Sequence, residues 1–332
     1  PRWTGAPLKY REAIAQATVD LMARDERVVV LGEGVTDPKG IFGTTRLAYE
    51  RFPDRVIEMP LSENLATGML AGLAVEGWKP ILVHARAEFA LLGWEHLVNT
   101  IAKWPWLHGG QQLPIIIRML VGRGWGQGPT HSQSFHGMLL QVPGLHVVVP
   151  VLPDSAAACI SLPVAMPRVI FEPRRMYEYE GMVDGQAGGP WATADVVLLS
   201  IGDVYVEALE AVGLLVQRGV RAIVAPIEDL SSGLRPAMPG LHNLPTVICD
   251  TSFGAAYQFL RLLTGPTALI EPSFVPCPTS AALEPTWYPT AGHIVQAALG
   301  LLGSDVPEVP LQSNGVSSMA DEVIRCRVKE PF

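Results

Sequence analysis

Short runs of aliphatic and β-branched residues alternate along the chain with longer stretches in which apolar residues recur every three or four positions. The first kind of run predicts buried strands and the second predicts amphipathic helices. In the first half, the predicted strands are 28–31, 56–59, 80–83, 114–118, 145–149 and 168–171. The predicted helices are 10–25, 47–52, 89–104 and 155–162. Strands that alternate with helices in this way are typical of βαβ units, so we expect an α/β fold with a parallel sheet.

The pattern is interrupted once and then resumes. Residues 174–191 lose their periodicity and are rich in Gly, Glu and Tyr, as a linker would be. The second block has predicted strands at 196–201, 222–225, 246–249 and 267–270, and predicted helices at 206–217, 255–263 and 291–302. We therefore expect a first domain at 1–175, a linker at 176–191, a smaller α/β domain at 192–302 and a polar tail at 303–332, irregular apart from 319–327.

The stretch from Pro60 to Gly68 carries a single carboxylate where a predicted strand runs into a helix. Ser62 is typical of an N-cap, and Glu63 falls in the first turn, where the helix dipole favours negative charge. Small residues recur on the helix at 68, 71, 72, 74 and 77, which indicates a closely packed neighbour. From these residues alone, Glu63 is either a capping carboxylate or a functional acid.

Composition narrows the class of protein. The chain has 332 residues, 48% hydrophobic content and a mean hydropathy of +0.26, which suggests large buried interfaces. The net charge of −8, with no basic stripe, argues against a nucleic-acid partner. No apolar run reaches the roughly 18 residues of a membrane helix, and the pattern of a signal peptide is missing, so we expect a cytoplasmic protein without a membrane partner. Four widely spaced cysteines indicate neither a zinc site nor a disulfide framework.

Three candidate functional groups follow predicted strands. Glu33, Glu63 and His131 lie at strand ends, and the carboxyl edge of an open α/β sheet is where ligands bind. His131 ends a glycine-rich segment that starts at Gly122, which we interpret as a mobile loop because no nucleotide-binding fingerprint is present. His136 follows five residues later, a spacing that does not suit a shared metal ion, and the chain has no GxSxG elbow.

Several motifs in fixed order resemble a known family. They are Val30-Leu31-Gly32-Glu33, Pro60-Leu61-Ser62-Glu63, Glu95 to Lys103, His131-Ser132-Gln133-Ser134 and Pro143 to Pro150, with a closing segment from Val275 to Val295. Over roughly residues 8–302 the chain resembles the beta subunit of the thiamin diphosphate-dependent decarboxylase component of 2-oxo acid dehydrogenase complexes. The resemblance implies a pyrimidine-binding domain followed by a smaller transketolase C-terminal domain.

The same resemblance implies roles for individual residues. Glu63 would hydrogen-bond the aminopyrimidine ring nitrogen and share a proton with it, which a dry setting favours. Phe89 would stack on that ring, and Leu61 belongs to the cofactor-binding motif. Glu33 matches an acid proposed to relay protons between active sites, and His131 matches a histidine of the substrate channel. Arg86 and Trp125, with His131, suggest a polar or anionic substrate.

Missing motifs imply partners. The family's Gly-Asp-Gly motif for the diphosphate and Mg is not matched by Gly202-Asp203-Val204, so a separate alpha subunit would hold both, in an α2β2 assembly. The acid usually found in the potassium-site loop is missing from 162–167, which leaves K binding open. The acyl group would pass to a lipoyl acyltransferase or to another acceptor. The alternatives are a biosynthetic split transketolase or acyloin-forming enzyme and a noncatalytic scaffold subunit; the sequence does not identify the 2-oxo acid.

Overall fold

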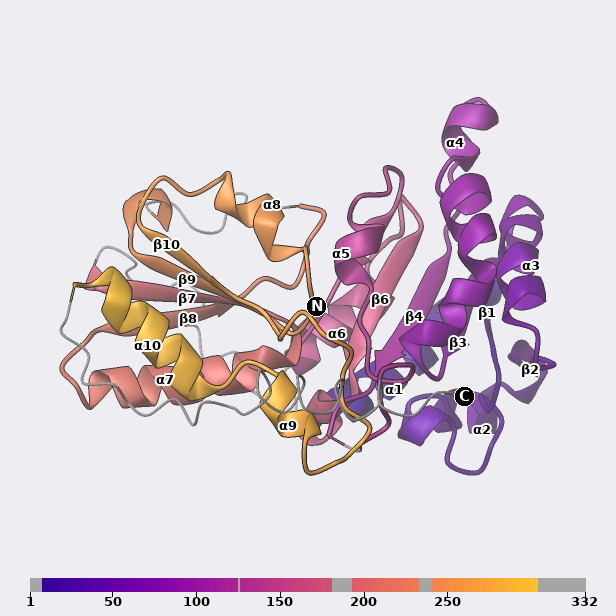
Figure 1. Ribbon diagram of the computed structural model, residues 1–332. Coiled ribbons are helices and arrows are strands. Elements are labelled where there is room, and N and C mark those ends of the chain that lie inside the picture. Colours follow the sequence, from indigo (N-terminus) through magenta and orange to yellow (C-terminus); the bar gives the residue numbers. More distant parts are fainter. Residues whose placement is uncertain (1–7, 125, 181–192, 233–240, 304–332) are drawn as a thin grey trace, which may run out of the picture. The chain divides into compact units, whose positions relative to one another are not determined.

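Two compact α/β units make up the chain. The computed structural model describes residues 8–124, 126–180, 193–232 and 241–303 (Figure 1). Among the described residues, one unit contains 8–122, 133–180 and 227–232, and the other contains 123–124, 126–132, 193–226 and 241–303. Each unit has its own parallel sheet, as the alternation of strands and helices predicted. The glycine-rich loop that carries His131 belongs to the second unit although the strand before it belongs to the first.

The first unit contains a six-stranded parallel sheet with the order β2-β1-β3-β4-β6-β5. Its strands are β1 (Val28–Gly32), β2 (Val56–Glu58), β3 (Lys79–His84), β4 (Ile116–Val121), β5 (His146–Val148) and β6 (Arg168–Pro173). Every residue of β1, β4 and β6 is buried, which explains why apolar residues do not alternate with exposed polar ones in these strands; the charged residues of β4 and β6 are themselves buried. In the register of β1 and β3, Gly32 lies opposite Val83, so both strands end at the same edge.

Helices pack on this sheet and on one another. They are α1 (Tyr10–Arg24), α2 (Arg46–Arg51), α3 (Glu63–Val75), α4 (Trp104–Leu107), α5 (His136–Leu139) and α6 (Pro153–Ser161). Helix α1 packs against α6 and α2, and α3 packs against β3 and the segment that follows β3. The buried positions of α3 are spaced by three and four residues, and Glu63 is one of them. The helix face that holds the core therefore also buries the candidate acid.

The segment predicted as one helix over 89–104 is helical but irregular. It consists of a 3-10 helix (Ala87–Gly93), a π-helix (His96–Ile101) and the short α4. A Cβ at Gly93 would collide with the side chain of Thr67 on α3, so glycine allows the two segments to approach closely. A close neighbour of α3 was expected from its small residues, and the His96 ring does lie 3.1 Å from the Cβ position of Gly68, but Gly72 and Gly77 have nothing within 4 Å. The contact at Gly93 accounts for a poor helix former at the point where the helix type changes.

Two glycines around α3 give opposite expectations for alanine. Gly93→Ala should lower the free energy of unfolding by about 1–3 kcal/mol, because Thr67 is buried and cannot move away from an added methyl group. Gly72→Ala is the matched control: Gly72 is exposed in α3, the helix of Thr67, with nothing near its Cβ position, and alanine there should raise stability by about 0.5–1 kcal/mol. Denaturant unfolding of the full chain measures both; equal effects would contradict the packing argument.

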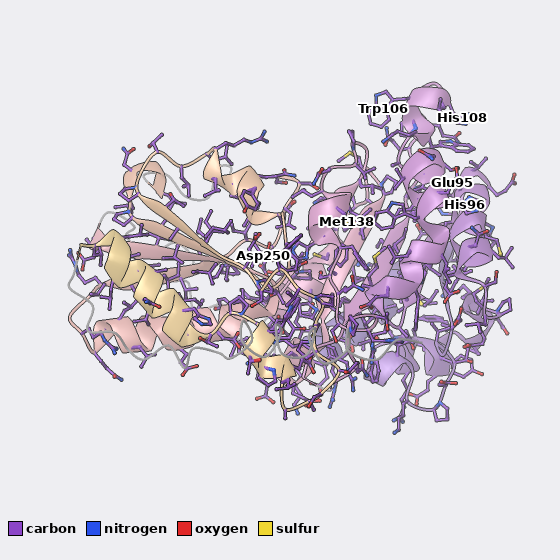
Figure 2. All side chains as sticks on the ribbon, viewed as in Figure 1. Glu95, His96, Trp106, His108, Met138 and Asp250 are labelled. Carbon is purple, nitrogen blue, oxygen red and sulfur yellow. The ribbon has the colours of Figure 1, made fainter. Side chains whose placement is uncertain are left out.

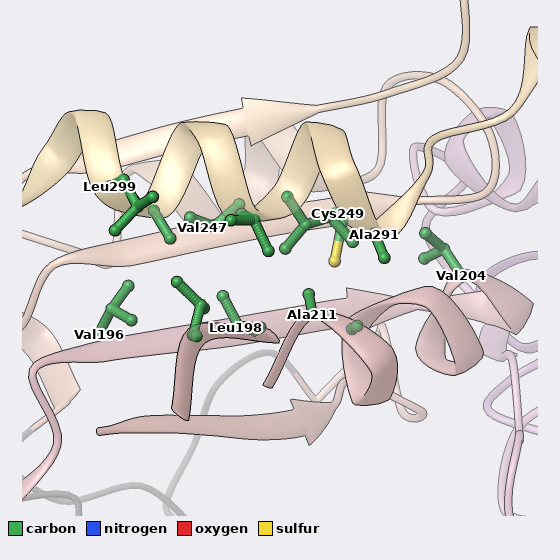
Figure 3. Close-up of a cluster of buried hydrophobic side chains, with 13 residues drawn as sticks. Val196, Leu198, Val204, Ala211, Val247, Cys249, Ala291 and Leu299 are labelled. Atoms are coloured by element: carbon green, nitrogen blue, oxygen red, sulfur yellow. The ribbon is translucent and has the colours of Figure 1, made fainter. Parts of the chain in front are cut away.

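The second unit contains a four-stranded parallel sheet with the order β10-β9-β7-β8. Its elements are β7 (Val196–Ile201), β8 (Ala222–Pro226), β9 (Thr246–Asp250), β10 (Thr267–Ile270), α7 (Tyr205–Val216), α8 (Ala256–Leu260), α9 (Glu284–Trp287) and α10 (Ala291–Leu301). Alternate residues of β7 and β9 meet α7 and α10 in one buried apolar cluster (Figure 3). Because these strands and helices bury one face in the cluster, their apolar residues recur with the period of a strand or a helix, and the sequence pattern predicted them.

Most predicted strands and helices are confirmed within a few residues, and β4 begins two residues later than expected. The predicted linker is partly a 3-10 helix (Arg174–Glu178), and its remainder from residue 181, like the tail from residue 304 and its segment 319–327, lies outside the described residues. Of the helices that the structure describes, none combines the length and apolarity needed to cross a bilayer. Cys159, Cys249 and Cys277 are free thiols, and the last two are buried.

Candidate active site

A partly open cavity lies at the carboxyl edge of the first sheet, and the space between its walls, part of which is open solvent, is about 290 Å³. Three of the residues singled out in the sequence, Glu33, Glu63 and Phe89, line it together. Its full lining is Gly32, Glu33, Met59, Glu63, Ala66, Leu82, Val83, His84, Ala85 and Phe89. The cavity is thus mostly apolar with two carboxylates and one imidazole, a composition typical of a site that orients a small ligand.

Glu63 enters the cavity from the first turn of α3. Ser62 is the N-cap residue, as predicted, but its side chain makes no capping hydrogen bond. Glu63 is only 8% exposed, and its backbone carbonyl accepts a hydrogen bond of 2.8 Å from the Thr67 hydroxyl. Glu63 is therefore held in a dry setting at a helix N-terminus, where the dipole favours its charge.

Glu33 follows β1 directly, and its carboxylate interacts electrostatically with that of Glu63. Burial and the negative charge of Glu63 raise the pKa of Glu33, while a hydrogen bond from the Ser62 backbone lowers it. The turn after Glu33 is fixed by Glu58, whose carboxylate accepts hydrogen bonds from the backbone of Gly34 and from the backbone and hydroxyl of Thr36. Burial and the nearby charge of Glu63 thus favour the protonated form of Glu33.

Phe89 sits in the 3-10 helix after β3, next to a second buried acid. One carboxylate oxygen of Glu88 accepts a hydrogen bond of 2.6 Å from the backbone of Gln133, and the other has no partner among the described residues. Burial raises the pKa of Glu88. Glu88 is not among the cavity-lining residues, and its contact instead fixes the chain just after the His131 loop.

His84, the last residue of β3, is a cavity residue that was not among the predicted site residues. It is 4% exposed, and its Nε2 has no hydrogen-bond partner in the part of the chain that the structure describes. Burial lowers the pKa of His84 to about 4, so the imidazole is uncharged near neutral pH. His84 therefore brings no positive charge to the cavity at neutral pH.

Arg86 and Leu61 lie outside the cavity lining. Arg86 is 8% exposed, donates a hydrogen bond of 2.7 Å to the Ala85 carbonyl and lies 5.7 Å from the ring centre of Phe42. Burial lowers the pKa of Arg86. Leu61 is 85% exposed, so its side chain is available to a neighbouring chain rather than enclosed by this one.

His131 lies in the second unit, in a loop held by contacts within that unit. Its Nδ1 lies 2.9 Å from the Thr130 hydroxyl. The buried carboxylate of Glu284 accepts hydrogen bonds from the backbone of Gly124 and Gly126, near the start of the loop. These contacts fix part of a loop that the sequence suggested to be mobile. Trp125, the remaining substrate candidate, lies outside the described residues.

Arg123 adds a second anchor to this loop. Its guanidinium lies 2.9 Å from Glu207, 3.3 Å from Asp203 and 4.0 Å from the centre of the Tyr288 ring. Sequence alone gave no sign of these contacts, because the partners are 80 to 165 residues away. Within the described residues, no group of three or more His, Cys, Asp or Glu side chains could hold a metal ion.

The chain is similar to proteins of a known family. Residues 6–180 match the transketolase pyrimidine binding domain. The beta subunit of acetoin:2,6-dichlorophenolindophenol oxidoreductase from Cupriavidus necator is 28% identical over 325 residues, covering 88% of this chain and 96% of that protein. The pyruvate dehydrogenase E1 beta subunit of Rickettsia felis is 37% identical over 145 residues, 43% of this chain and 44% of that one.

A solved structure shows the same fold. The chain of a split-gene transketolase, described as an inactive beta4 tetramer, has a TM-score of 0.65 and 21% identity, covering 91% of this chain and 100% of that one. The domain match spans more than half of the chain, and the full-length similarities are to beta subunits. The chain therefore belongs to the transketolase pyrimidine-binding-domain family, among the beta subunits of the E1 type.

Proposed function

We propose that this chain is the beta subunit of a thiamin diphosphate-dependent enzyme that decarboxylates a 2-oxo acid and works only with a separate alpha subunit. The observation that carries the proposal is the cavity that buried Glu63 and half-buried Glu33 and Phe89 line together. An aminopyrimidine ring needs a carboxyl group at its ring nitrogen and an aromatic or apolar surface at its face, and the cavity provides both.

In this proposal each residue has a distinct task. Glu63 would hold a proton at the pyrimidine ring nitrogen, Phe89 would cover the ring face, and Glu33 would exchange protons with Glu63. The apolar walls exclude water, which strengthens the interactions of both carboxylates. When bound, thiamin diphosphate supplies the group that accepts the electrons left by loss of carbon dioxide. His131 is carried over from the resemblance as the group that faces the substrate.

The alpha subunit would hold the diphosphate and Mg. Asp203 is 2% exposed and lies 3.3 Å from Arg123, so it is already paired within the second unit. A partner chain also fits the apolar side chains that α3 and α4 leave exposed, including Leu65, Met69 and Trp106, the last 67% exposed (Figure 2). We propose an α2β2 assembly, with a lipoyl acyltransferase as acyl acceptor.

Acetoin cleavage is a second candidate reaction, because two relatives that match over nearly their full length are named for acetoin. The experiment is to produce the chain with an alpha subunit encoded beside it and to measure dye reduction with pyruvate, other 2-oxo acids and acetoin. We expect turnover that requires thiamin diphosphate, Mg and both chains. Turnover of acetoin alone would select the second candidate, and failure of the two-chain complex to bind thiamin diphosphate would exclude both.

A further inference from the structure

Arg168 binds backbone carbonyls at the C-terminal end of α6, the region where the family resemblance implies a potassium site. Its Nη1 donates hydrogen bonds of 2.7 Å and 3.2 Å to the carbonyls of Cys159 and Leu162, and its Nη2 donates one of 3.0 Å to the Pro163 carbonyl. The residue is 6% exposed. One guanidinium thus supplies hydrogen bonds to three backbone carbonyls.

These carbonyls are the ligand type that a potassium ion would use. Backbone carbonyl oxygens at a helix C-terminus carry partial negative charge and attract cations. Here the positive charge that they attract belongs to the chain itself. A guanidinium has five N–H donors in a fixed plane, so it can bind several carbonyls at once, as a bare ion does. The segment 162–167 carries no acid, so a cation at this site would be held by carbonyl oxygens.

The charge of Arg168 is balanced without any ion. Its Nε donates a hydrogen bond of 3.1 Å to Nδ1 of His146, whose Nε2 lies 3.0 Å from a carboxylate oxygen of Asp229. Burial raises the pKa of Asp229, but hydrogen bonds from His146 and Ser232 outweigh it and lower the pKa to about 2. Asp229 is therefore ionised at neutral pH, and a guanidinium, an imidazole and a carboxylate form one connected, charge-balanced set.

We propose that the Arg168 guanidinium takes the place of the monovalent cation, so that this beta subunit is stabilised at the end of α6 without potassium. The residues present do not fit a potassium ion, because the carbonyls at this site are already bound. The inference concerns the stability of this chain and rests on its family membership rather than on its substrate. Its test therefore does not depend on activity.

The test is thermal unfolding of the full chain in potassium and in sodium buffers of equal ionic strength. Wild type should unfold at the same temperature in both. Arg168→Ala should unfold about 2–10 °C lower in sodium, because three carbonyls lose their donor, and potassium should restore part of the loss by occupying the vacated space.

Arg55 offers a matched control. Its guanidinium also binds three carbonyls, those of Met22, Asp25 and Val28 near the end of α1. Arg55→Ala should be destabilised without any response to potassium. A higher unfolding temperature of the wild type in potassium than in sodium would overturn the proposal. So would an Arg168→Ala variant whose unfolding temperature does not rise in potassium. If Arg168→Ala does not fold, the comparison of the wild type in the two buffers still tests the proposal.

Discussion

Glu63→Gln should lower turnover of the two-chain enzyme by about 10²–10⁴-fold, the usual contribution of a positioned acid or base. Glutamine keeps the size and the hydrogen-bonding oxygen of the side chain but cannot exchange a proton with a ring nitrogen. Glu63 is buried in the cavity with Glu33 and Phe89, so water cannot easily replace it. The measurement is steady-state dye reduction with the alpha subunit, saturating thiamin diphosphate and Mg.

The control makes the same substitution at a solvent-exposed glutamate of the same unit. Glu95 has a side chain that is 62% exposed, and Glu95→Gln should leave turnover unchanged (Figure 2). Thiamin diphosphate binding by calorimetry separates loss of chemistry from loss of cofactor: Glu63→Gln should weaken binding far less than turnover. Wild-type turnover in Glu63→Gln would remove Glu63 from the mechanism and return it to the role of a helix-terminal carboxylate.

Most strands could be predicted from the sequence because parallel strands that are buried on both faces are rich in aliphatic residues. β1 and β7 are examples, each fully buried and each found within one residue of its predicted bounds. The helix types of the segment after β3 could not be predicted in this way, because they depend on the close approach of α3 at Gly93. Apolar periodicity does not report a contact with a residue 26 positions away.

The candidate site was partly predictable for a related reason. Strand ends of a parallel sheet share one edge, so Glu33 and Glu63 could be placed near each other before their cavity was seen. The groups that hold such residues could not be foreseen: Glu58 fixes the turn after Glu33, and Glu284 fixes the loop before His131. Each is an ordinary acid in sequence whose role is set by a backbone N–H distant along the chain.

The largest loss of stability is expected at a buried ion pair in the first unit. Arg118 and Glu172 are both fully buried, and their side chains form two hydrogen bonds of 2.5 Å and 2.9 Å. Thr44 accepts a further bond from Arg118, and Tyr177 donates one to Glu172. Arg118→Met should lower the free energy of unfolding by about 3–5 kcal/mol, because the carboxylate of Glu172 is left buried without its countercharge.

Two comparisons separate loss of the charge pair from loss of packing. Arg46→Met makes the same substitution in the exposed pair of Arg46 and Glu50, and should cost about 0–1 kcal/mol. Adding Glu172→Gln to Arg118→Met removes the unpaired charge and should restore part of the stability. Denaturant unfolding of the wild type, Arg118→Met, Arg46→Met and the double variant measures these effects. If the double variant were less stable than Arg118→Met alone, packing of the two side chains, and not their charges, would hold β4 to β6 at this point.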